Sequence, residues 1–106
     1  MIIVNFGDYD IGVWFDHVRA DDPDFRDGTN CLIYVGDAGS KLRSRPSVAC
    51  GHSLVNPKDK NFNRGVGRHV SFFRALENSP LSKEERGSLV EKVRNSCKLI
   101  DPKYVK

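Results

Sequence analysis

Apolar residues alternate with other residues along the first fifty positions of the chain. Ile2 and Val4 begin the pattern, and residues 11–18 continue it with aromatic and β-branched side chains; residues 31–36 form a continuous apolar run that is a further strand candidate. Residues 47–50 form a further short apolar run. A period of two in residues of these types predicts short β-strands.

Two stretches interrupt this pattern and predict connecting segments. Residues 19–30 are rich in Asp and contain a Pro and a Gly, so we expect a loop there. Residues 51–63 hold Gly, Pro, Asn and Asp with little periodicity, which also indicates a connector. The last strand is therefore expected to end before residue 51.

The periodicity then changes to that of an α-helix. Val66, Val70, Phe73 and Leu76 fall at i, i+4, i+7 and i+10, which places them on one apolar stripe. Asn63 precedes the stripe, and its side chain is suited to accept a hydrogen bond from a free amide of the first turn. The pattern predicts a helix that begins after Asn63.

A second helix is predicted behind the Asn-Ser-Pro sequence of residues 78–80, which ends the first. Ser82 and Glu85 form an S-x-x-E capping box, and Leu89 and Val93 lie inside the helix that follows. Strands that precede helices indicate an α+β fold. We expect a small N-terminal antiparallel β-sheet followed by a C-terminal two-helix hairpin.

The length and composition fit this expectation. A chain of 106 residues, 39% apolar and 29% charged, is suited to one domain, residues 1–106, with a modest core. Small folds often hide apolar surface by self-association, so a homo-oligomer is expected. Residues 99–106 are expected to be extended.

The chain shows no feature of a membrane or secreted protein. No apolar run approaches the roughly 18 residues of a membrane span, and the N-terminus lacks the basic region of a signal peptide. Cys31, Cys50 and Cys97 are odd in number and widely spaced. We expect reduced thiols that act as small core residues in a cytoplasmic protein.

The net charge of +3 is distributed unevenly along the chain. Residues 1–30 carry −5, because they contain seven Asp and two Arg, whereas residues 31–80 carry +5 and residues 81–106 carry +3. The acidic and basic parts are expected either to complement each other at a subunit contact or to leave an anion-attracting surface.

The start of the first predicted helix is the candidate binding site. Arg64 and Arg68 are four residues apart, so their guanidinium groups can clamp one phosphate, and a helix N-terminus favours an anion. Gly65 and Gly67 would let a ligand approach the backbone, and Phe62 could stack on a base. The alternative is structural: glycines for tight helix packing, a core Phe62 and solvated arginines.

The same segment resembles a family of phage proteins. Ala49-Cys50, Asn56-Pro57-Lys58-Asp59, Phe62-Asn63-Arg64, Gly67-Arg68 and Arg74-Ala75-Leu76 are similar to the pattern of the phage anti-Thoeris sponges of the first type. The match covers residues 49–76, with Ser71 and Phe72 in place of smaller or more polar residues. The strand-then-helix order extends it loosely to the rest.

The resemblance implies a binding protein without enzymatic activity. Such sponges sequester the cyclic ADP-ribose isomer of a bacterial immune sensor, and some hold cyclic oligonucleotides, in dimers that group into hexamers with ligand between subunits. It implies a ligand role for four residues of the segment: Phe62, Asn63, Arg64 and Arg68. Asp59 of the same motif and Arg45, from the basic KLRSR stripe, complete the candidate ligand-binding set.

Other chemistry has weaker support in the sequence. Cys50 and His52 are two potential metal ligands, but no second pair at zinc spacing follows, and their nearness to Ser53 is adjacency in sequence only. We therefore expect no catalysis, no metal and no cofactor. Two alternatives to a sponge stay open: an anti-CRISPR-type inhibitor using the acidic residues 20–27, and, less favoured, nucleic-acid binding through KLRSR.

Overall fold

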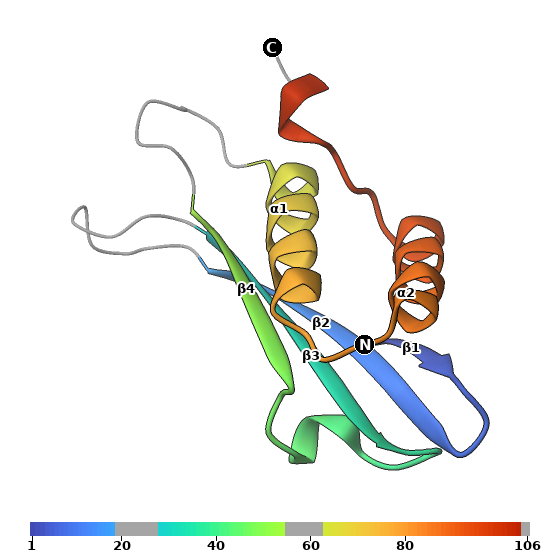
Figure 1. Cartoon of the computed structure of the whole chain (residues 1–106). Helices are drawn as coiled ribbons and strands as arrows, with labels where there is room; N and C mark the ends of the chain where they lie inside the picture. The colour runs from blue at the N-terminus through green and yellow to red at the C-terminus, as the bar shows by residue number, and fades with distance from the viewer. Residues whose placement is uncertain (19–27, 55–62, 105–106) are drawn as a thin grey trace.

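The computed structural model describes residues 1–18, 28–54 and 63–104, as four strands followed by two helices (Figure 1). The elements are β1 (Ile2–Asn5), β2 (Tyr9–Val18), β3 (Gly28–Asp37), the 3-10 helix η1 (Leu42–Ser44), β4 (Ala49–Leu54), α1 (Arg64–Glu77), α2 (Lys83–Ser96) and the 3-10 helix η2 (Pro102–Tyr104). The predicted α+β class, with an N-terminal antiparallel sheet and a C-terminal helix pair, is confirmed.

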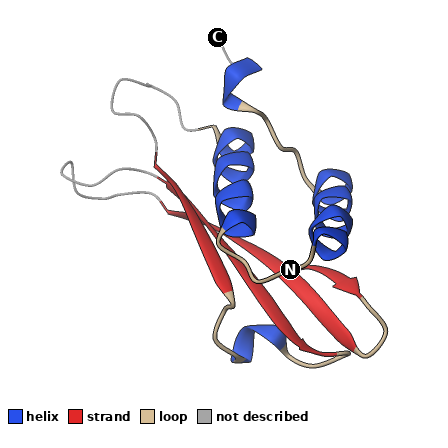
Figure 2. Ribbon diagram, viewed as in Figure 1, coloured by secondary structure: helices blue, strands red, loops and turns tan. Residues whose placement is uncertain are grey.

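The strands form one antiparallel sheet in the order of the chain, β1-β2-β3-β4. The central strands β2 and β3 pair over ten positions, from Tyr9 opposite Asp37 to Val18 opposite Gly28. Figure 2 shows both helices on the same face of this sheet. The opposite face is left to side chains of the strands and to η1.

Alternation along the strands divides their side chains between these two faces. Ile11 pairs with Val35 and Val13 with Ile33, and all four point to the helical layer. Ile11, Val13 and Ile33 are at most 1% exposed, so they form the floor of the core. The side chain of Leu42 in η1 packs on the other face, against the glycines of β2 and β3.

Helix α1 buries a face that only partly matches the stripe predicted from apolar spacing, since Leu76 of that stripe is buried. Ser71, Phe72 and Ala75 are fully buried, whereas Val66 and Val70 are only half-buried. A Cβ on Gly51 of β4 would overlap backbone atoms of α1. The buried face of α1 therefore combines Phe72 and Leu76 with small residues, and the small residues lie where the helix passes closest to β4.

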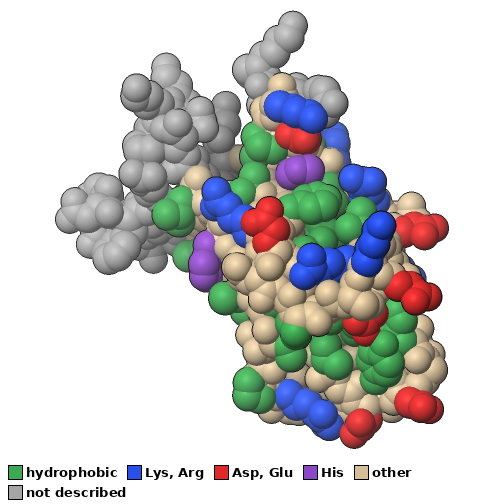
Figure 3. Space-filling model, in the orientation of Figure 1, with side chains coloured by type: hydrophobic (Ala, Val, Ile, Leu, Met, Phe, Trp, Pro, Cys, Tyr) green, Lys and Arg blue, Asp and Glu red, His purple; other side chains and the backbone are tan. Residues whose placement is uncertain are grey.

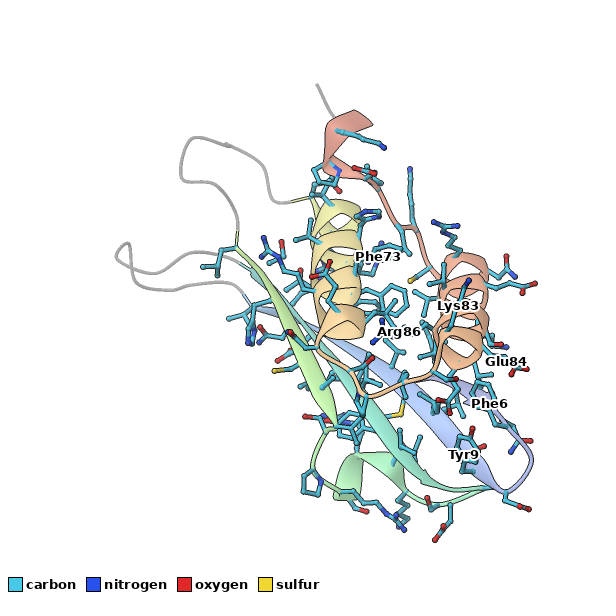
Figure 4. The ribbon with its side chains drawn as sticks, viewed as in Figure 1. Phe6, Tyr9, Phe73, Lys83, Glu84 and Arg86 are labelled. Atoms are coloured by element: carbon cyan, nitrogen blue, oxygen red, sulfur yellow. The ribbon has the colours of Figure 1, made fainter. Side chains whose placement is uncertain are left out.

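Helix α2 begins with the predicted capping box and lies against β1. The Ser82 hydroxyl accepts a hydrogen bond from the Glu85 amide (3.1 Å), and the Glu85 carboxylate accepts one from the Ser82 amide (2.9 Å). The Tyr9 hydroxyl donates to the same carboxylate (2.6 Å), and the ring stacks on Phe6. Figure 4 shows Phe6 and Tyr9 beside the end of α2 that carries Lys83 and Glu84.

Three predicted boundaries are wrong. Strand β3 begins at Gly28, within the loop expected over residues 19–30, because β2 continues to pair with it. Strand β4 covers residues 51–54 of the expected connector, where its polar and glycine residues hid the strand pattern. The end of the chain contains the helical turn η2 within the segment expected to be extended.

The cysteines only partly fit the expected core role. Cys31 is buried in the core and Cys97 is half-buried, but Cys50 is exposed on the face of the sheet opposite the helices. All three are free thiols. Burial raises the pKa of the thiols of Cys31 and Cys97, which keeps both protonated at neutral pH.

Candidate functional site

The N-terminal end of α1 is built as the sequence predicts. Asn63 is the N-cap, and its side-chain oxygen accepts a hydrogen bond from the Val66 amide (3.2 Å). The first turn contains no acidic residue. An acidic side chain there would offset the positive end of the helix dipole. Because the first turn of α1 has none, it keeps its attraction for an external anion.

Arg64 and Arg68 lie on the first two turns of α1. Both charges act on His17, whose pKa is lowered by burial first and then by Arg64 and Arg68, while Asp16 opposes the shift. The His17 ring contacts the Thr29 hydroxyl of β3 at 2.9 Å. The charges of both arginines therefore reach the same ring, where Asp16 partly offsets them.

No acidic side chain of the described residues neutralises these two arginines. Asp101 lies 3.9 Å from the His69 ring nitrogen and 3.7 Å from the Lys103 ammonium. Across residues 1–18, 28–54 and 63–104, no carboxylate lies within ion-pair distance of Arg64 or Arg68. In Figure 3, Lys and Arg side chains lie among Asp and Glu side chains over the helical layer of this face.

The segment after α2 returns to this end of α1 and completes its surroundings. The Arg68 Nε donates a hydrogen bond to the Lys98 carbonyl (2.9 Å), and the Ile100 amide donates to the Gly65 carbonyl (3.1 Å). Arg68 is thereby held in place and half-buried, while Arg64 is exposed. One guanidinium is fixed by the fold and the other is free to adjust.

Packing accounts for both glycines of the predicted site. A Cβ on Gly65 would come within 2.6 Å of the Ile100 side chain, and a Cβ on Gly67 would overlap the Thr29 hydroxyl. Both glycines are buried. The structural alternative that the sequence left open is therefore confirmed for Gly65 and Gly67, and neither is exposed to a ligand.

The structure brings together three of the six predicted ligand-binding residues: Asn63, Arg64 and Arg68 lie within the first two turns of α1 and its cap. Asp59 and Phe62 lie outside the described residues. Arg45 follows η1 at the opposite end of the sheet (Figure 1), where its guanidinium lies 3.4 Å from Asp37. Arg45 is thus separate from the two arginines of α1.

The sequence did not reveal His17 and Thr29 as members of this site. Both stand near the ends of paired strands, opposite each other in the sheet register. The alternation of residues 11–18 places His17 on the inner face. The next predicted strand begins at residue 31, which is too late to include Thr29. A correct start for β3 would have placed Thr29 beside His17.

The described residues contain no group of three or more His, Cys, Asp or Glu arranged to hold a metal ion. No helix in the described part of the chain has the length and apolar character needed to cross a membrane. Comparisons with protein-family models, curated proteins and solved structures gave no match.

Proposed function

We propose that this chain captures a phosphate-bearing cyclic nucleotide at the N-terminal end of α1 and releases it chemically unchanged. The observation that supports this proposal is that Arg64 and Arg68 stand four residues apart at the start of α1, without a carboxylate partner among the described residues. Guanidinium groups bind phosphate oxygens bidentately, and such charge-assisted hydrogen bonds are roughly twice as strong as neutral ones.

The two arginines have different roles in this proposal. Arg68 is positioned before ligand arrives, because its Nε is bonded to the Lys98 carbonyl and its terminal nitrogens remain for phosphate. Arg64 stands at the first position of α1 and is exposed, so it closes on the ligand from the solvent side. Pre-organisation of one arginine reduces the entropy lost on binding.

The biological role that we propose rests on the sequence resemblance described above. The protein would act in the cytoplasm of an infected bacterium as a phage anti-defence sponge, removing a cyclic immune signal by stoichiometric binding. The ligand would lie between subunits of a homo-oligomer. Light scattering of the purified protein, with and without ligand, tests the oligomeric part of this proposal separately from binding.

The experiment is isothermal titration with cyclic ADP-ribose isomers and a panel of cyclic di- and trinucleotides. Binding at low-micromolar strength or tighter (about −8 kcal/mol or more), with intact ligand recovered after denaturation, supports the proposal. A cleaved ligand would overturn it. If no ligand of the panel binds, the proposal is also overturned, and the alternative of a protein inhibitor that acts through its surface is favoured.

Titrations at several pH values add a signature specific to this site. The pKa of His17 is lowered by burial and, after burial, by Arg64 and Arg68; bound phosphate would offset the charges of the two arginines, so the pKa of this ring should rise on binding. Binding should therefore take up protons and tighten as the pH falls towards 6. Titration in buffers of different ionisation enthalpy measures the uptake, and His17→Gln should abolish it.

A further inference from the structure

Three polar side chains on the open face of the sheet form a cluster that nucleotide capture does not use. Cys50 and His52 stand two residues apart on β4, so both point away from the helices, and Asn30 lies directly opposite His52 on β3. All three belong to paired strands. Residues on a rigid sheet are held in fixed relative positions.

The cluster places a thiol beside an imidazole, and the imidazole beside a side-chain amide. The Cys50 Sγ lies 3.9 Å from the His52 Nε2, and the His52 Nδ1 lies 2.6 Å from the Asn30 Oδ1. An amide oxygen only accepts hydrogen bonds, so the Asn30 contact favours the tautomer with the ring proton on Nδ1. The lone pair of Nε2 is then directed to the thiol, as in Cys-His-Asn triads.

Helix α1 fixes the strand that carries the cluster. Arg74 donates a hydrogen bond to the His52 carbonyl (2.6 Å), and Asn78 donates one to the Cys50 carbonyl (3.2 Å). Because β4 is an edge strand of the sheet, these side chains supply donors that a further strand would otherwise provide. The two bonds hold the backbone of Cys50 and His52 while leaving their side chains exposed.

We propose that Cys50, His52 and Asn30 form a nucleophilic thiol site that accepts an acyl group from an ester or thioester. His52 Nε2 takes the thiol proton as Sγ attacks the carbonyl carbon of the ester. The bond to the leaving alcohol or thiol then breaks, and the imidazolium returns its proton to that group. The products are S-acylated Cys50 and one free alcohol or thiol.

The test uses 4-nitrophenyl acetate as the acyl donor and the full chain. The expected result is one acetyl group per chain, located on Cys50 by peptide mass spectrometry, with the matching release of nitrophenolate. Cys31 and Cys97 are internal controls, because burial keeps both thiols protonated. Acetylation of lysines or of Cys97 at the rate of Cys50 would overturn the proposal.

His52→Gln separates base catalysis from simple exposure of the thiol. General-base catalysis contributes about 100-fold or more to such a rate, so acetylation of Cys50 should slow by this factor. The wild-type rate should also fall in D₂O, and the variant rate should not. Equal acetylation rates in wild type and His52→Gln would overturn the role of His52. A thermal midpoint shared by the two proteins excludes unfolding of the variant as the cause of a slower rate.

Asn30 is a positioning residue in this proposal, and two variants of similar size test it. Asn30→Asp keeps an oxygen for the His52 Nδ1 proton and should retain most of the rate. Asn30→Leu removes the acceptor and should slow acetylation about tenfold or more, the size of effect typical when a histidine loses its orienting partner. Equal rates in both variants would contradict the positioning role.

Discussion

Replacing Gly51 with alanine tests how closely α1 lies on the sheet. A Cβ at this position would overlap the Ser71 carbonyl oxygen and the Ala75 amide nitrogen, and it would lie 3.0 Å from the Arg74 carbonyl carbon. All three atoms belong to the helix backbone, so no side-chain rotation can relieve the overlap. The helix must therefore move away from β4 as a unit.

The expected loss in the free energy of unfolding of Gly51→Ala follows from two opposing effects. Overpacking in a core costs typically 1–3 kcal/mol, and we take about 3 kcal/mol because backbone meets backbone. Alanine is favoured over glycine in a strand by roughly 0.5–1 kcal/mol, which leaves a net loss of about 2 kcal/mol. For a chain near 100 residues this corresponds to a fall in Tm of about 8–16 °C.

Gly87→Ala is the matched control, because it makes the same chemical change in open space. Gly87 is exposed within α2, and no atom of a neighbouring element lies within 4 Å of the position that a Cβ would take. Alanine should stabilise the helix here by about 0.5–1 kcal/mol. Thermal melts of both variants give the comparison, and a Gly51→Ala protein as stable as wild type would refute the described packing.

Three other changes test the core, a cap and one carboxylate. Phe72→Ala should cost about 3–5 kcal/mol in denaturant unfolding, because the ring is fully buried, and a loss below about 1 kcal/mol would contradict its position. Ser82→Ala should cost about 1 kcal/mol through loss of the α2 cap, and circular dichroism should show fraying. Hydrogen bonds from the Gly39 amide and from Asn5 lower the pKa of Asp10 below its ordinary 3.8. The ionised carboxylate therefore stabilises the fold above that value, and this stabilisation is lost as the pH falls through the folded pKa. Asp10→Asn should make the free energy of unfolding depend less on pH on the acid side. An unchanged pH dependence would contradict this linkage.

Periodicity and capping predicted most of the fold because both depend on local sequence. The S-x-x-E sequence at Ser82 and the Asn63 cap are recognised from a few adjacent residues, and both are present as predicted. The buried side of α1 was predicted only in part from spacing, which identified Leu76 but not Ser71, Phe72 and Ala75. Its face is set by Gly51 across the interface, a long-range partner that gives no local signal.

The two candidate sites also differ in whether a local sequence signal or a long-range contact defines them. Arg64 and Arg68 were predicted together, because four residues of one helix place them on one side. The partnership of Cys50 and His52 with Asn30 depends on the register between β3 and β4. That register requires a strand over residues 51–54, which the polar composition conceals, so the sequence alone shows only that Cys50 and His52 are neighbours.

The most direct test of the proposed nucleotide site is a double-mutant cycle on Arg64 and Arg68. Titration of the best ligand of the panel into Arg64→Gln, Arg68→Gln and the double variant gives their coupling free energy. Arg94→Gln, on the exposed surface of α2, controls for loss of net charge.

If both arginines hold one phosphate, each single change should weaken binding about 10-fold or more, and the coupling should exceed about 0.5 kcal/mol. Arg94→Gln should bind like wild type. Wild-type affinity in both single variants, or losses that add without coupling, would contradict a shared phosphate site at the N-terminal end of α1.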